Sequence, residues 1–153
     1  QGKIQAWTVY STRTGPLFLQ VYRLVSGTTY RLIGENAVAT TGIGLHNFQI
    51  ALANQIEFQA GDFVGWRFTD TTSNPGYGGN IYFSRTGTLD PNETGGVRWA
   101  YYPDYTGISV GGTLNFTTYD TRTYSIQAHY NVPEPGTFVV CFLGMGFLLY
   151  LKK

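Results

Sequence analysis

Apolar and polar residues alternate in short segments over most of the chain, which is the pattern of β-strands with one buried face. Residues 3–10, KIQAWTVY, form the first such segment. Side chains two positions apart share a face of a strand, so Trp7 and Val9 are expected together on one face. The other face is predicted to carry Ile4, Ala6, Thr8 and Tyr10.

A β-hairpin is predicted from the next two segments. Residues 17–24, LFLQVYRL, and residues 28–36, TTYRLIGEN, are separated by a short connection that contains Ser26 and Gly27. A tight, glycine-containing turn between two alternating segments is typical of antiparallel neighbours. We therefore expect these two strands to pair with each other.

The rest of the body repeats this organisation. Residues 45–52, LHNFQIAL, are predicted as a strand with Phe48, Ile50 and Leu52 on one face. In residues 63–68, FVGWRF, Gly65 indicates a bulge or a close approach by a neighbouring group. The remaining predicted strands are residues 80–84, 97–102, 113–119 and 124–130.

This series of about nine short strands, with no helical periodicity before residue 136, predicts an all-β fold. We expect a single antiparallel β-sandwich, jelly-roll-like in its chain path, over residues 1–131. Residues 15–36 and the stretch GDFVGW at residues 61–66 also resemble strand-turn patterns of secreted jelly-roll domains. The three tryptophans are expected in the core or at its edge, with sugar stacking as the alternative for one of them: Trp7, Trp66 and Trp99.

Charge and composition narrow the class of protein. The chain has ten Lys and Arg against nine Asp and Glu, and no basic stripe. A nucleic-acid partner is therefore not expected. Lys3 is the only lysine before the last two residues, while Gly, Thr and Tyr are abundant. Such a composition is typical of secreted β proteins, and because the chain begins with Gln1 we expect that a secretory signal has been removed.

One stretch has the letters of a catalytic motif. Residues 107–111, GISVG, match GxSxG with Ser109 at its centre, and Asp120 and His129 follow it. In hydrolases this motif is a turn between a strand and a helix. Here it runs directly into TLNFTTY, a strand pattern, so we expect no catalytic residues and no enzyme activity.

Metal sites and cofactors are not expected from the histidines. His46 and His129 are the only two, and neither has the spacing of a zinc site. Carboxylates in the predicted loops leave calcium open as a ligand, since loop carboxylates and carbonyls are its usual partners. The carboxylates concerned are Asp70, Asp90, Glu93 and Asp104.

The last 22 residues, VPEPGTFVVCFLGMGFLLYLKK, differ from the body. Residues 132–137 are predicted to be a stiff spacer, because its two prolines cannot donate to a strand ladder. Residues 138–153 are predicted to be a hydrophobic helix with a basic end. Its 14 uncharged residues would extend about 21 Å, which is short for a membrane span.

The apolar tail cannot stay in water. Burying its nine Phe, Leu and Val side chains is favourable by on the order of 13 to 27 kcal/mol as an upper bound. The tail is therefore expected in lipid, packed against protein, or cut off. Gly144 and Gly146 would allow close approach of neighbouring helices, so copies of the chain are an expected partner.

The tail resembles the PEP-CTERM sorting signal of Gram-negative bacteria. The head of the motif corresponds to Val132, Pro133, Glu134, Pro135, Gly136 and Thr137. The hydrophobic part is represented by Phe138, Val139, Phe142, Leu143, Gly144, Gly146, Phe147, Leu148 and Leu151. The basic end is Lys152 and Lys153, a pair rather than the longer cluster of the family pattern.

This resemblance covers the tail only, and it implies a location and partners. It implies export, an exosortase-type processing enzyme, passage through a membrane, and association with polysaccharide of the cell surface or biofilm. We therefore expect a secreted, non-catalytic structural protein of a bacterial extracellular assembly, such as a filament with the C-terminal helices packed in its core. The alternative is a carbohydrate-binding or adhesive surface module.

Overall fold

The chain forms antiparallel β-strands in the computed structural model, which describes residues 1–68, 81–84, 98–100, 108–116, 119–121 and 123–132. The predicted all-β class is confirmed, and the one helical element within these ranges is a single 3₁₀ turn at Leu52–Asn54. The long strands are β1 (Gly2–Ser11), β2 (Gly15–Ser26), β3 (Thr29–Thr40), β4 (Gly44–Gln49), β6 (Phe63–Phe68) and β12 (Ile126–Asn131). The short strands are β5 (Glu57–Phe58), β7 (Phe83–Ser84), β8 (Arg98–Ala100), β9 (Thr113–Asn115), β10 (Tyr119–Thr121) and β11 (Thr123–Tyr124).

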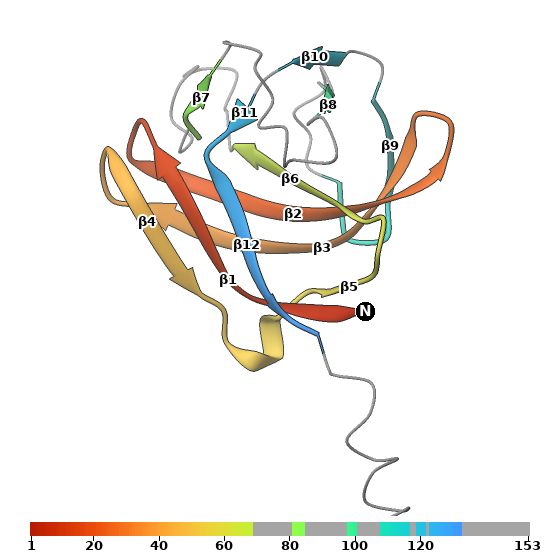
Figure 1. Cartoon of the computed structure of the whole chain (residues 1–153), viewed down its shortest axis with the longest axis horizontal. Helices are drawn as coiled ribbons and strands as arrows, with labels where there is room; N and C mark the ends of the chain where they lie inside the picture. The colour runs from red at the N-terminus through yellow and green to blue at the C-terminus, as the bar shows by residue number, and fades with distance from the viewer. Residues whose placement is uncertain (69–80, 85–97, 101–107, 117–118, 122, 133–153) are drawn as a thin grey trace, which may run out of the picture.

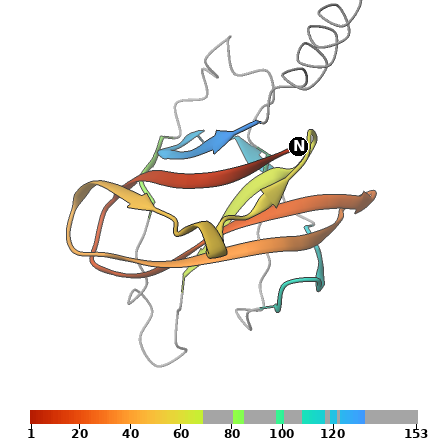
Figure 2. The same ribbon diagram turned by 90° about the horizontal axis from the view of Figure 1, so that it is seen from below.

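The described strands form two four-stranded sheets and two two-stranded sheets, in which β8 pairs with β10 and β7 pairs with β11. The first, here called the β1 sheet, has the order β12-β1-β4, with β5 also paired to β1. The second, the β2 sheet, has the order β6-β2-β3-β9. Figure 1 shows β12, β1 and β4 in front of β2 and β3, and Figure 2 shows β1 and β12 in a layer above β2 and β3. The predicted two-layer sandwich is therefore confirmed, and the jelly-roll-like path stays a prediction.

The predicted hairpin is the β2–β3 pair, at the centre of the β2 sheet. Its register runs from Gly15 opposite Thr40 to Ser26 opposite Thr29, with one extra residue, Ile33, on β3. Gly27 lies in the connection with φ +53°, a left-handed conformation that glycine adopts without strain. Both strands are longer than the sequence indicated, so this hairpin is the main support of its sheet.

A bulge in β1 changes the predicted faces of that strand. Ile4 is opposite Tyr130 but Ala6 is opposite His129, so Gln5 is an extra residue in β1. One extra residue reverses the alternation of faces along a strand. Ile4 therefore lies in the core with Trp7 and Val9, and its predicted place with Ala6, Thr8 and Tyr10 is wrong.

The strand predicted at residues 45–52 ends early. β4 stops at Gln49, and the chain then makes the 3₁₀ turn. Phe48 and Ile50 pack against the core as predicted, but Leu52 is 77% exposed, so its predicted position with them is wrong. The backbone N–H of Ile50 still donates to the O of Gln5, the extra residue of the β1 bulge, at 2.8 Å, one position beyond the last paired residues, Ala6 and Gln49.

The core lies between the two sheets. Trp7 is fully buried, and Trp66 packs against the core from β6, which confirms the predicted location of both; Trp99 lies in β8. The fully buried side chains of the cluster alternate along β1 and β2, as two facing sheets require. The cluster consists of Ile4, Trp7, Val9, Leu17, Leu19, Val21, Ile56 and Ile81.

The predicted spacer and helix of the tail lie outside the described residues, apart from Val132. Within the described ranges, no helix has the length and apolar character needed to cross a membrane. Of the predicted spacer, only Val132 is described, and its side chain is exposed. The predicted helix at residues 138–153 lies outside the described residues and stays a prediction.

Candidate functional site

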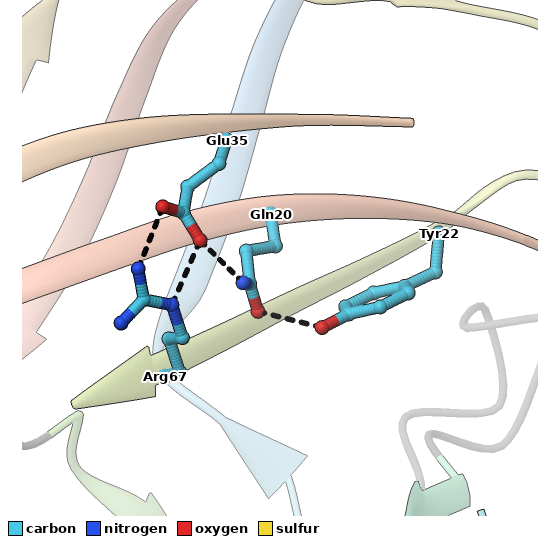
Figure 3. A network of polar contacts seen from close by, with 4 residues as sticks. All are labelled: Gln20, Tyr22, Glu35 and Arg67. Carbon is cyan, nitrogen blue, oxygen red and sulfur yellow. Dashed lines mark hydrogen bonds and ion pairs between the residues drawn. The ribbon is translucent and has the colours of Figure 1, made fainter. Parts of the chain in front are cut away.

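Four polar side chains form a connected network on the face of the β2 sheet that points away from the core cluster (Figure 3). They come from three adjacent strands, β2, β3 and β6. The Arg67 guanidinium donates through Nε to Glu35 Oε2 at 2.9 Å and through Nη2 to Glu35 Oε1 at 2.8 Å. Gln20 Nε2 donates to Glu35 Oε2 at 2.6 Å, and the Tyr22 hydroxyl donates to Gln20 Oε1 at 2.9 Å. The strand register brings them together, since Gln20 is opposite Glu35 on one side and opposite Gly65 on the other.

Two close contacts fix this network. The guanidinium of Arg67 lies 3.6 Å from the centre of the Phe18 ring, which is directly across from it in the register. The Tyr22 ring occupies the space above Gly65, because a Cβ added at Gly65 would lie 2.7 Å from Tyr22 Cε2. This confirms the predicted close approach at Gly65 and explains why a glycine stands there.

Burial changes the acidity of the phenol in the network. Gln20 is 1% exposed and Tyr22 is 7% exposed. The pKa of Tyr22 is raised to about 12, chiefly by burial; the charge of Glu35 contributes to the rise and that of Arg67 opposes it. The hydroxyl is therefore a permanent donor at physiological pH, and it cannot serve as a base there.

A second bidentate ion pair ties β2 to the start of β6. Arg23 donates through Nε and Nη2 to the two carboxylate oxygens of Asp62, at 2.7 and 2.8 Å. Asp62 Oδ2 also accepts the backbone N–H of Gln59. The hydrogen bonds from Arg23 are the largest cause that lowers the pKa of Asp62, and the N–H of Gln59 adds to the effect. This carboxylate stays ionised and acts as a turn anchor.

The outer face of the β1 sheet carries a different set of groups. Thr8 lies directly opposite Gln127 of β12 and Asn47 of β4. Thr8 Oγ1 donates to Asn47 Oδ1 at 2.6 Å, and it lies 2.8 Å from His129 Nε2. A hydroxyl has one hydrogen, so His129 Nε2 must be the donor in the second contact. The three side chains form an exposed polar row across three strands.

Two tyrosines lie at one end of this face. The rings of Tyr10 and Tyr82 meet edge to face, with centroids 5.9 Å apart. Their backbones are also joined, since Tyr82 N–H donates to Tyr10 O at 2.8 Å. Tyr10 is 39% exposed and Tyr82 is 50% exposed, so the pair presents aromatic surface to solvent.

The described part of the GxSxG stretch, residues 108–111, does not have the strand-to-helix geometry of a nucleophile turn. Ser109 O accepts the N–H of Gly112 at 2.9 Å, Gly111 has φ +94°, and the turn leads directly into strand β9. This confirms that the motif precedes a strand. The turn is bonded to Leu32 of the β2 sheet, whereas His129 lies on β12 of the β1 sheet. The other histidine, His46, contacts Gly42 O at 3.0 Å and stacks on Phe48.

The predicted calcium candidates lie outside the described residues, as do the sorting-motif residues from Pro133 onward. In the described part of the chain, no group of three or more His, Cys, Asp or Glu side chains is placed to hold a metal ion. Calcium and the sorting motif therefore stay predictions.

Sequence reasoning did not single out the polar network or the tyrosine pair. Alternation along residues 3–10 did place Thr8 and Tyr10 on one face, and that pair of assignments is confirmed. Nothing local indicated that Tyr82, 72 positions further on, would lie beside Tyr10, because a separate bridge between Ser11 and Ile81 brings it there.

Comparisons of the chain with protein-family models, with curated proteins and with solved structures found no match to any of them.

Proposed function

We propose that this chain is a secreted, non-catalytic structural protein of a bacterial extracellular surface or biofilm assembly. In this proposal the sandwich, with its jelly-roll-like path, forms the outer body of each subunit. The C-terminal helices of neighbouring copies pack together in the core of a filament.

The observation that supports a structural role is that the described carboxylates are held in ion pairs. Each of the three carboxylates whose side chains are described is in an ion pair with a cation from another strand. Glu35 pairs with Arg67, Asp62 with Arg23, and Glu57 with Lys3. Carboxylates held in this way join neighbouring segments of the chain, whereas a catalytic acid or base has to be free to reach a substrate and exchange a proton with it.

The proposed location rests on the sequence of residues 132–153. The spacer, apolar segment and basic end resemble a sorting signal of exported proteins in Gram-negative bacteria, which supports a place outside the cell. Exposed apolar side chains on the body also support contact with other subunits, since such groups near one another favour protein contact. Leu24 and Val25, at the tip of the β2–β3 hairpin, are 46% and 50% exposed.

Two measurements on protein isolated from its native source test the proposal. The first is intact mass: a chain that retains residues 138–153 supports a tail-cored assembly, and a mass that ends before Gly136 contradicts it. The second is electron microscopy of the full chain without detergent. Filaments or sheaths are expected, and monodisperse single particles with an intact tail would overturn self-assembly.

A second function is favoured by one observation. A carbohydrate-binding or adhesive module needs an exposed aromatic platform on one face of the sandwich, and Tyr10 and Tyr82 provide such a surface. We therefore propose glycan contact as an additional role of the body, compatible with a place in a polysaccharide-rich matrix.

A further inference from the structure

We infer that the outer face of the β1 sheet is a binding site for a neutral polysaccharide. The face, here called the Thr8 face, is built on strands β4, β1 and β12. This inference deepens the glycan contact proposed above and rests on it. The described residues that form it are Ala6, Thr8, Tyr10, Leu45, Asn47, Gln49, Tyr82, Gln127 and His129.

The backbone holds the tyrosine pair in place before any ligand arrives. Tyr82 is bonded on both sides, since its N–H donates to Tyr10 O and its carbonyl accepts from the N–H of Ser125 at 2.9 Å. Tyr10 N–H in turn donates to Ser125 O at 3.0 Å. Next to Tyr82, Ile81 is fully buried in the core. A site whose parts are already ordered loses less conformational entropy on binding, which favours affinity.

The exposed rings suit the C–H face of a sugar ring. The face of an aromatic ring carries partial negative charge, and the axial hydrogens of a pyranose carry partial positive charge. Tyr10 and Tyr82 also keep a hydroxyl that can bond to water or to a sugar hydroxyl. Leu45, directly opposite Tyr10 on β4 and 65% exposed, extends the apolar part of this end of the face.

The polar row beside the tyrosines suits sugar hydroxyls. Asn47, Gln49 and Gln127 are all exposed, and each amide both donates and accepts hydrogen bonds, as a hydroxyl does. Thr8 orients two members of the row, because it donates to Asn47 Oδ1 and accepts from His129 Nε2. The amide of Asn47 also carries an NH₂ group, which can donate to a sugar hydroxyl.

The charges of the face indicate a neutral ligand. Among the residues that form the Thr8 face there is no Lys, Arg, Asp or Glu. The nearest charged group along β1 is Lys3, beyond the bulge, and it is paired with Glu57 at 3.0 Å. A phosphate or a uronic acid polymer would find no lysine or arginine among the described residues of this face, and nucleic acid binding depends on such cations.

The shape of the face fits an extended chain. Three strands span roughly 10 Å, and the distance along β1 from Ala6 to Tyr10 is roughly 13 Å, given ordinary strand spacings. A short run of sugar residues can therefore lie across the amides with one ring against the tyrosines. Among the described residues that form the Thr8 face, Leu45 is the one exposed aliphatic side chain, which is too little for a membrane-binding face.

Co-sedimentation of the full chain with insoluble polysaccharides tests this inference. The probes are cellulose, a β-1,3-glucan and starch granules as neutral polymers, with calcium-gelled alginate as the charged comparison. We expect wild-type protein to bind at least one neutral polymer and not alginate. Tyr10→Ala and Tyr82→Ala should each weaken that binding by about tenfold, and Thr8→Val should weaken it while leaving the tyrosines in place.

Matched variants separate the site from general effects. Tyr130→Ala removes a ring that is 59% exposed and contacts Phe58, outside the Thr8 face, so it should bind as wild type does. Tyr82→Trp keeps an aromatic ring and should retain binding, which distinguishes stacking from a folding defect. If Tyr10→Ala does not fold, Thr8→Val and Tyr82→Trp still decide the matter.

The outcomes that contradict the inference are distinct. Wild-type binding to a neutral polymer that survives Tyr82→Ala and Thr8→Val would place the contact elsewhere on the protein, with glycan binding itself intact. Binding to alginate alone would overturn the neutral ligand. Binding to none of the four polymers would reject both the site and the proposed glycan role.

Discussion

The indole N–H of Trp7 donates to Asn36 Oδ1 at 2.9 Å, and this bond joins the two sheets through the core. Trp7 is on β1 and fully buried, and Asn36 is on β3 and 6% exposed. Asn36 Nδ2 continues the connection by donating to Asn54 O, in the 3₁₀ turn that follows β4. One asparagine thus satisfies the buried indole N–H of Trp7 and a backbone carbonyl of the turn after β4.

Replacing Asn36 should destabilise the protein markedly. Asn36→Ala leaves the Trp7 N–H and the Asn54 carbonyl without their partner, and an unsatisfied buried group costs about 1 to 3 kcal/mol. Chemical denaturation followed by Trp fluorescence measures the change. Asn131→Ala, an exposed asparagine at the end of β12, is the control and should change stability by less than about 0.5 kcal/mol. Equal stability of the two variants would contradict the role of the bond.

A side chain at residue 65 should be tolerated poorly. In Gly65→Ala the new Cβ would lie 2.7 Å from Tyr22 Cε2, so the Tyr22 ring has to move away from its hydrogen bond with Gln20. We expect a loss of about 1 to 3 kcal/mol in denaturant unfolding, as for other overpacked sites. Gly42→Ala is the matched control, because nothing lies within 4 Å of a Cβ there. A stable Gly65→Ala protein would show that the ring is free to move.

The buried phenol of Tyr22 should make the protein sensitive to alkali. Its pKa is raised to about 12 in the folded state, whereas that of a tyrosine in the unfolded chain is about 10. A raised pKa contributes stability that is complete below pH 10 and is lost as the pH rises toward 12. The difference corresponds to about 3 kcal/mol. Denaturation midpoints between pH 9 and 12 should therefore fall more steeply for wild type than for Tyr22→Phe, and parallel curves would contradict the assignment.

The Arg23–Asp62 pair should make stability depend on acid. The pKa of Asp62 is lowered in the folded state, chiefly by the hydrogen bonds from Arg23. A lowered pKa contributes stability above the unfolded value of about 4, and this contribution is lost as the pH falls through the lower folded value. Asp62→Asn should therefore be less stable than wild type at pH 7, with the gap closing below pH 4. Thermal unfolding of both proteins at several pH values measures this difference in stability.

The exposed ion pair is the control for that series. Lys3 and Glu57 have side chains 50% and 63% exposed. Solvent screens such pairs, so Glu57→Gln should alter stability by at most about 1 kcal/mol at pH 7. A Glu57→Gln effect as large as that of Asp62→Asn would show that exposure does not separate the two pairs.

Part of the candidate site was accessible from the sequence. Alternation placed Thr8 and Tyr10 on one face, and Gly65 indicated a close approach. The network of Glu35, Arg67 and Gln20 could not be predicted from the sequence. Glu35 and Arg67 are 32 residues apart and meet only through the pairing of β3 and β6 with β2. Pairing between distant strands leaves no local pattern in the chain.

The sequence by itself determined the all-β class, the β2–β3 hairpin and the core positions of Trp7 and Trp66. These follow from local alternation and turn residues, which act over a few positions. Only the tertiary structure decided the faces of β1 and the end of β4. Ile4 enters the core because the extra residue Gln5 reverses the alternation, and Leu52 leaves it because β4 ends at Gln49. Bulges and strand ends depend on the partner strand. The contact of Tyr10 with Tyr82 likewise depends on a distant segment, through the bridge between Ser11 and Ile81.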